Sequence, residues 1–253
     1  SLSYGVFGVA EDEVEWRAFD ASGQKAKIRE DGRNFGIVRL NYERSAGDRF
    51  AFGYLGTLVD GPVYQARVHG VDAHFAKQNG LWSSDLQLIR SKVANVSGTG
   101  AMLNFDYAVS SRFQHHLRLD YFDEDVDIND LGFLQRNDFR GLQYIFRYAL
   151  PNSDGFVRRT RGAISMERRE NISAGQLVDG GIYWRNTMEL TGRNTLRTGL
   201  AWFPERFEDL DSRGNGSYKA EDRVWWQTML NTDSSKMFSW TFLVGGVQED
   251  LGD

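Results

Sequence analysis

Hydrophobic and polar residues alternate with a period of two along most of the chain. In the segment 112–122, Leu117 and Tyr121 fall on one face, and Arg118 and Asp120 fall on the other. Alternation of this kind over four to eight residues is typical of a β-strand with one polar face. Similar runs occupy 35–43, 49–58, 63–76, 81–91, 100–108, 141–149, 181–191, 195–203, 223–231 and 237–247. No stretch combines a helical period with caps, so we expect an all-β antiparallel meander of about a dozen strands.

Connections of two lengths separate these runs. Long polar connections are expected at 20–34, 123–139 and 205–222. The short turns are expected at 45–48, 78–80 and 191–194. Short turns together with long loops are typical of a transmembrane β-barrel, but a soluble β-sandwich also mixes loop lengths. The pattern therefore predicts a transmembrane β-barrel, or a large part of one, and leaves a soluble β-domain open.

The polar faces of the runs carry the side chains that would line the lumen of such a barrel. The candidate lumen-facing residues are Arg118, Asp120, Arg147, Arg185 and Glu189. In a soluble, half-exposed sheet the same residues would face solvent. Aromatic residues gather toward strand ends, at Tyr54, Tyr107, Tyr121, Trp184, Trp202 and Trp225. These fit an aromatic girdle at a lipid interface, or the packed core of a sandwich.

Composition narrows the possible partners. The chain has 253 residues, enough for one large β-domain, and we expect a single domain over 1–253 that is an internal segment of a longer chain. Its formal charge of −5 lacks the basic excess needed to bind nucleic acid. It has no cysteine, which excludes disulfides and thiolate sites. Three prolines against 27 glycines suit extensive sheet. No window approaches 18 apolar residues, so we expect no transmembrane helix.

The acidic segment 123–132 suggests a calcium loop, which we weigh against a solvated surface loop. Asp125, Asp127 and Asn129 have the spacing of the first ligands of an EF-hand. However, Asp130 stands where that loop needs glycine, and Arg136 stands where it needs a bidentate glutamate. The solvated loop is therefore favoured.

The four histidines do not predict a zinc site. His115 and His116 are adjacent, so a strand would point them to opposite faces. His69 and His74 are separated by an odd number of residues, which also places them on opposite faces. We expect no metal site and no cofactor.

No catalytic constellation is recognisable either. There is no nucleophile elbow, phosphate loop or dinucleotide fingerprint, although a carboxylate pair of an envelope hydrolase stays open. The basic residues Arg158–Arg161 with Arg168 and Arg169 could bind an anionic ligand or lipopolysaccharide, or could form a solvated or lumen-facing patch. We expect no enzyme.

A motif in the segment 127–140, DINDLGFLQRNDFR, is more specific. An acidic lead is followed by Gly-Phe and then by Arg, Asp and Arg at alternate positions. The residues that carry this pattern are Asp127, Asn129, Gly132, Phe133, Arg136, Asp138 and Arg140. Upstream, Gly70, Asp72 and Phe75 precede Trp82 in a Gly-x-Asp-x-x-Phe strand. On these motifs the chain resembles the DUF5916 family of bacterial proteins.

The resemblance implies an outer-membrane β-barrel region. In members of the family this region follows a signal peptide and a periplasmic β-sandwich similar to family 9-type carbohydrate-binding domains. It implies outer-membrane lipid as a partner and a bacterial outer-membrane location, with the periplasm as the alternative. The family supplies no catalytic residues that can be transferred to this chain.

The resemblance also focuses attention on the connection 123–139. We hypothesise an ordered loop at a barrel rim or folded inward, anchored by Phe133, Leu134 and Phe139, with Arg136 and Asp138 paired or satisfying backbone groups. The alternative is an ordinary hairpin loop whose aromatic residues cap the barrel end.

These observations together predict a protein that passes or binds a polar solute, such as a saccharide, through a charged lumen. Two alternatives stay open: a soluble periplasmic β-domain that binds carbohydrate, and an envelope carbohydrate-active hydrolase.

Overall fold

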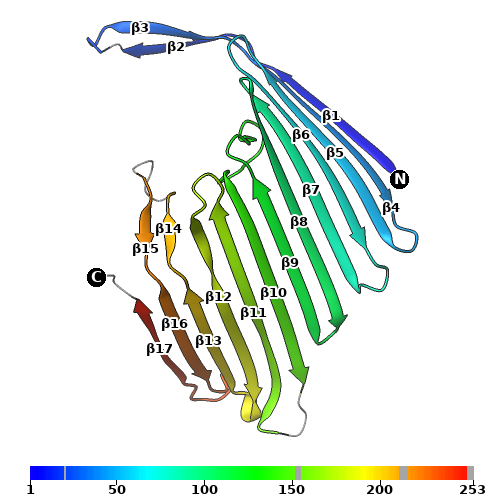
Figure 1. Ribbon diagram of the computed structural model, residues 1–253, viewed down its shortest axis with the longest axis vertical. Helices are drawn as coiled ribbons and strands as arrows, with labels where there is room; N and C mark the ends of the chain where they lie inside the picture. The colour runs from blue at the N-terminus through cyan, green and yellow to red at the C-terminus, as the bar shows by residue number, and fades with distance from the viewer. Residues whose placement is uncertain (20, 152–154, 211–215, 250–253) are drawn as a thin grey trace. The chain divides into compact units, whose positions relative to one another are not determined.

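The computed structural model describes residues 1–19, 21–151, 155–210 and 216–249, and these form an antiparallel meander of β-strands (Figure 1). The main sheet has 13 strands in the order β1-β4-β5-β6-β7-β8-β9-β10-β11-β12-β13-β16-β17. Its strands are β1 Leu2–Ala10, β4 Asn34–Arg44, β5 Arg49–Asp60, β6 Gln65–Ala76, β7 Trp82–Val93, β8 Val96–Ser110, β9 Phe113–Phe122, β10 Phe139–Pro151, β11 Val157–Asn171, β12 Leu177–Leu190, β13 Thr195–Phe203, β16 Arg223–Asn231 and β17 Thr241–Glu249. The expected all-β antiparallel meander is confirmed.

Two small hairpins lie outside the main sheet. They pair β2 (Val14–Phe19) with β3 (Lys25–Glu30), and β14 (Arg206–Glu208) with β15 (Tyr218–Ala220). A 3-10 turn, η1 (Thr191–Arg193), joins β12 to β13. Within the described residues, no helix has the length and apolarity required to cross a membrane.

The main sheet is open as far as the described residues show it. β1 and β17 stand at the two ends of the strand order, and no sheet formed by the described residues closes into a barrel. The antiparallel meander is therefore shown, while closure into a transmembrane barrel stays a prediction.

Several segments differ from the sequence expectation. The polar connection expected at 20–34 contains β3, and the one expected at 205–222 contains β14 and β15, while its residues 211–215 lie outside the described part. β1 and β2 were not among the expected strands, and neither was β11. Its alternation is blurred because Thr160, Gly162 and Arg168 occupy positions on the otherwise apolar face.

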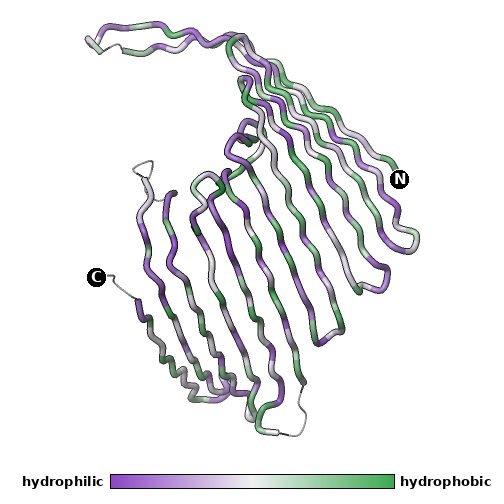
Figure 2. The backbone as a smooth tube through the Cα atoms, in the orientation of Figure 1, coloured by the Kyte–Doolittle hydropathy of each residue, from purple (hydrophilic) through white to green (hydrophobic). Residues whose placement is uncertain are grey.

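The chain divides into two compact units, which we describe separately. Unit 1 comprises Ser1–Phe75, Asp85–Met102 and Phe122–Asp138. Unit 2 comprises Ala76–Ser84, Leu103–Tyr121 and Phe139–Asp253. In both units hydropathy alternates from residue to residue along the strands, as the colouring of Figure 2 shows.

In unit 1 the registers of β1, β4 and β5 collect large apolar side chains on one face, and many are solvent-exposed. Leu2 pairs with Tyr42, which pairs in turn with Phe52, and Tyr4 pairs with Leu40. The exposed members of this face are Leu2, Tyr4, Val6, Val38, Leu40, Tyr42, Phe52 and Leu58. The opposite face contains the buried side chains Val59, Ala66 and Ile89, so the core of unit 1 lies on that side.

Unit 2 separates its faces in the same way, and we name them the apolar face and the charged face. Four successive rows of the apolar face cross β10, β11, β12, β13 and β16. They are Tyr144, Met166, Ile182, Trp202, Val224; Phe146, Ile164, Trp184, Leu200, Trp226; Tyr148, Gly162, Asn186, Thr198, Thr228; and Leu150, Thr160, Met188, Leu196, Leu230. Because side chains alternate along each strand, the intervening residues form the charged face.

Candidate functional site

The connection between β9 and β10, residues 123–138, is an ordered loop. It packs against the face of unit 1 that carries Val59, Ala66 and Ile89, which we call the inner side of unit 1. Val126 is only 1% exposed. The backbone of the loop lies directly over β8, since a Cβ added at Gly98 would be 2.0 Å from the amide nitrogen of Val126. The buried hydroxyl of Ser91 on β7 accepts a hydrogen bond from the amide of Asp127 at 3.0 Å. Glycine at position 98 is therefore what allows the 123–138 loop to reach the sheet.

Side chains of the signature motif organise the loop from within. Asp127 Oδ1 accepts the amide hydrogen of Asn129 at 3.0 Å, and Asn129 Oδ1 accepts that of Leu134 at 2.7 Å. The Asn137 amide donates to the carbonyl oxygens of Glu124 at 2.7 Å and Val126 at 3.2 Å. Asx side chains commonly replace missing backbone partners in this manner. The loop thus keeps a defined conformation without forming a strand or helix.

A tyrosine at the start of β6 joins the loop to the sheet. The Tyr64 hydroxyl donates to Asp130 Oδ2 at 2.7 Å. This hydrogen bond to the Asp130 carboxylate, together with burial and the nearby negative charge, raises the pKa of Tyr64 to about 12. The neutral phenol is therefore the form that holds the loop.

The hydrophobic anchors differ in part from those expected. The expectation that Phe133 anchors the loop is wrong, because its side chain is 82% exposed. Leu134 is half-buried, and Phe139, which begins β10, is buried under the guanidinium of Arg169 at 5.3 Å from its ring centre. Val126 is the most buried side chain of the loop. The sequence analysis did not predict it as an anchor, because it lies within the acidic segment 123–132.

The other motif residues have mainly structural contacts. A Cβ at Gly132 would come 2.8 Å from the carbonyl oxygen of Ile128, so a tight loop bend needs glycine there. Asp138 has a positive φ of 54°, and its amide donates to the carbonyl oxygen of Asp123 at 3.1 Å. Arg140 lies on β10 and pairs with Glu170 at 2.7 Å, and Arg136 is half-buried.

Two of the three candidate calcium ligands, Asp127 and Asn129, and the four histidines are engaged in other contacts. The carboxylate of Asp127 and the amide oxygen of Asn129 accept backbone hydrogen bonds, as described above. Over the described ranges, no three His, Asp or Glu side chains are grouped so as to hold a metal ion. The histidine contacts are His69 with Tyr54 at 2.8 Å, His74 with Asp85, His115 with Tyr144 at 2.7 Å and His116 with Asp106 at 2.9 Å.

Not all of the inner side of unit 1 is apolar. Arg39 on β4 and Asp72 on β6 form a two-point ion pair, at 2.6 Å and 3.1 Å, across β5. A side chain on the intervening strand would collide with it, because a Cβ at Gly53 would lie 2.3 Å from the Asp72 carboxylate. Asp72, part of the Gly-x-Asp-x-x-Phe motif, is thereby explained as a cross-strand partner.

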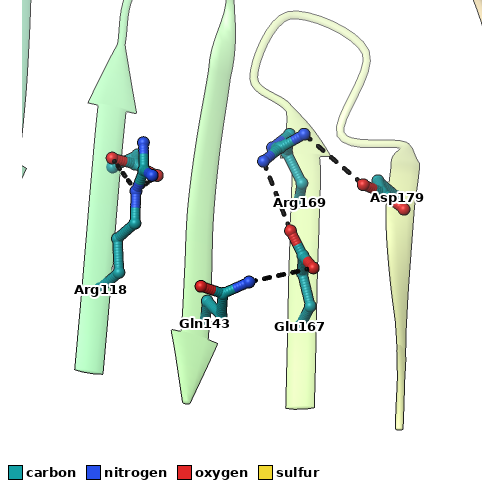
Figure 3. Close-up of polar contacts among 6 residues, drawn as sticks. Arg118, Gln143, Glu167, Arg169 and Asp179 are labelled. Carbon is teal, nitrogen blue, oxygen red and sulfur yellow. Dashed lines mark hydrogen bonds and ion pairs between the residues drawn. The ribbon is translucent and has the colours of Figure 1, made fainter. Parts of the chain in front are cut away.

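In unit 2 polar side chains bond across neighbouring strands on the charged face, as Figure 3 shows. Gln143 on β10 donates to Glu167 on β11 at 3.3 Å. Arg169 contacts Glu167 at 3.4 Å and Asp179 on β12 at 3.5 Å. The ladder connects three strands, and the two carboxylates share one guanidinium.

All five candidate lumen-facing residues lie on this charged face. Arg118 bonds the buried carboxylate of Asp120 at 2.8 Å on β9, and a Cβ at Gly141 would lie 3.7 Å from the Cβ of Asp120. Arg147 and Arg185 occupy one row, and Glu189 lies on the same side of β12. The five residues thus share one face, and whether that face lines a lumen stays a prediction.

The charged face has a strong excess of arginine. Three successive rows carry Arg147 and Arg185; Arg161 and Arg197; and Arg159 and Glu189. Glu189 pairs with Arg161 at 2.9 Å and approaches Arg159 at 3.9 Å. Arg147, Arg185 and Arg197 have no acidic partner among the described residues. Sequence reasoning proposed Arg147 and Arg185 but missed Arg197.

These features define the protein class as an antiparallel β-meander in which each unit exposes an apolar face and unit 2 also has a charged face. The family model described as Domain of unknown function (DUF5916) matches residues 20–250. The match covers most of the chain, so the protein belongs to this family. No curated protein and no solved structure matches it.

Proposed function

We propose that this chain forms the wall of an outer-membrane β-barrel that passes or binds a polar solute, such as a saccharide, along its charged face. The proposal involves no catalysis. Its main support is the apolar surface exposed in each unit, together with the charged face of unit 2, whose arginines partly lack an acidic partner among the described residues. A soluble monomer rarely exposes contiguous apolar patches larger than a few hundred Å². A barrel in lipid needs such a surface on its outside.

The dimensions of the apolar face agree with a bilayer. On β10 it extends from Leu142 to Leu150, which at about 3.4 Å per residue is roughly 27 Å along the strand. A tilted transmembrane strand needs about 9–11 residues, and the outward apolar band of such barrels is roughly 25 Å tall.

Polar atoms on the apolar face bond to one another. Trp184 Nε1 donates to the Tyr148 hydroxyl at 3.0 Å, which donates to the buried Asn186 at 3.0 Å. His115 pairs with Tyr144 on the same side. Groups facing hydrocarbon must find partners within the protein, because lipid supplies none.

A barrel in lipid also requires that every strand edge be paired. The proposal therefore includes pairing of β1 and β17, with each other or with further strands, when the protein is in the membrane.

The test is membrane fractionation followed by gel migration in detergent with and without heating. We expect the protein in the outer membrane, with a mobility that changes on heating. The variant Leu200→Lys places a cation on the apolar face and should reduce membrane assembly, at a cost of about 2–4 kcal/mol. Gln227→Lys, on the charged face, is the matched control and should assemble normally. A soluble protein without a mobility shift would overturn the proposal in favour of the periplasmic carbohydrate-binding alternative.

A further inference from the structure

A hollow on the charged face of unit 2 combines an aromatic surface with an exposed arginine, Arg185, that has no acidic partner among the described residues. It has a volume of about 260 Å³, and its walls include Tyr183, Arg185, Phe203, Arg223 and Trp225. Pockets for whole small molecules are typically about 300–1,000 Å³, so this hollow suits a single ring of a larger ligand.

The floor of the hollow is made by small residues that let an aromatic ring lie flat. Trp225 pairs with Ala201, and its ring extends over the neighbouring Gly199, where an added Cβ would be 2.7 Å from two ring atoms. Arg185 pairs with that same Gly199. A ligand ring that stacks on Trp225 would therefore lie beside a guanidinium.

The other aromatic wall is fixed by its own contacts. Tyr183 meets Phe203 edge-on, with ring centres 5.2 Å apart. Arg223 lies over the same Phe203 ring at 4.4 Å and is within 3.4 Å of Glu249. Arg223 is thus occupied, whereas Arg185 is exposed and has no acidic partner among the described residues.

Cations continue beyond the hollow in a defined arrangement. Arg147 and Arg185 are in one row two strands apart, which corresponds to about 10 Å. Arg197 is diagonal to Arg185, because Arg185 pairs with Gly199 and Arg197 pairs with Thr187. Exposed guanidiniums without partners bind carboxylates in two-point geometry.

We infer that this hollow binds an acidic saccharide, with one sugar ring stacked on Trp225 and its carboxylate on Arg185. Carboxylates on neighbouring sugars would meet Arg147 and Arg197. The inference rests on the proposed function, because it names the class of solute that the charged face accepts. A neutral saccharide would leave the three arginines without a partner, and a small inorganic anion would leave the aromatic surface unused.

The experiment is isothermal titration calorimetry of the whole chain, folded in detergent, with trigalacturonate as the probe. Maltotriose is the neutral comparison, and tripolyphosphate is the anion without a ring. We expect saturable binding of trigalacturonate at least about tenfold tighter than that of the other two. Arg185→Gln should weaken it about tenfold or more, because a charge-assisted pair is lost.

Two matched controls separate the site from general effects. Arg29→Gln removes the same charge from a guanidinium that pairs with Glu13 at 3.1 Å in the β2–β3 hairpin, and should leave binding unchanged. Trp225→Leu should weaken binding, whereas Trp226→Leu, the next residue on the opposite face, should not. Heat-dependent gel migration checks that each variant is folded, and Arg147→Gln provides a second variant of the cation row with a smaller expected loss.

The outcomes distinguish this inference from the proposed function. An outer-membrane protein that does not bind trigalacturonate, or whose Arg185→Gln variant binds like Arg29→Gln, overturns the inference alone. Equal binding of tripolyphosphate with no effect of Trp225→Leu also overturns it, because charge would then suffice. A soluble protein that binds trigalacturonate through Arg185 and Trp225 supports the site and overturns the membrane proposal.

Discussion

The inner side of unit 1 and the charged face of unit 2 are built on strands with the same alternation, yet they are filled differently. In unit 1 the 123–138 loop covers the sheet and buries Val126 and Ser91. In unit 2 the corresponding side of β10–β13 remains open, with arginines exposed. Alternation therefore decides which face of a strand a side chain lies on. Whether that face becomes buried core or stays exposed depends on whether a loop, such as 123–138 in unit 1, covers it.

The strongest test of this comparison adds a cation to each face. Val59, on the inner side of β5, is 1% exposed, so Val59→Lys should destabilise the protein by about 3–5 kcal/mol through an uncompensated buried charge. Gln227→Lys, on the open face of unit 2, should change stability by less than about 0.5 kcal/mol. Urea unfolding in detergent measures both. Equal effects would contradict the distinction between a covered and an open face.

A second test lifts the loop without adding charge. Gly98→Ala forces a methyl group into the backbone of the 123–138 loop and should cost about 1–3 kcal/mol. Amide hydrogen exchange should then increase at residues 124–137. Gly70→Ala, on β6, is the control, since its nearest atoms would be 3.9 Å from the new Cβ. Unchanged exchange in Gly98→Ala would show that the loop is not held against β8.

The Tyr64–Asp130 hydrogen bond should contribute less, about 1 kcal/mol. The pKa of Tyr64 is raised to about 12, so its stabilisation is fully present below pH 10 and is lost as the pH rises from about 10 through 12. The urea midpoints of wild type and Tyr64→Phe should therefore differ at pH 9 and converge as the pH approaches about 12. A difference that persisted at high pH would assign the effect to packing.

The smallest expected effect concerns Phe133. Its side chain is 82% exposed, so Phe133→Ala should change stability by less than about 0.5 kcal/mol. Phe139→Ala, which removes a buried ring, should cost about 3 kcal/mol or more. A drop in folded yield with Phe133→Ala would restore the anchoring role that the structure does not show.

The sequence alone predicted most strands of the main sheet and the two faces of each. Period-two alternation identified β4–β10, β12, β13 and β16 to within a few residues and placed Arg118, Arg147 and Arg185 on the polar side. The physical reason is local: a strand points alternate side chains to opposite faces whatever its neighbours are. β11 was not predicted, because Gly162 and Arg168 interrupt the alternation on its apolar side.

Only the tertiary structure decided which residues meet. The 123–138 loop packs against Gly98 and Ser91, and the ring of Trp225 packs over Gly199. The registers between the strands determine which of these residues meet. No local pattern encodes such registers, because they follow from the packing of many strands together. For the same reason Phe133, the most conspicuous apolar residue of the loop, is exposed, while Val126 in the acidic run is buried.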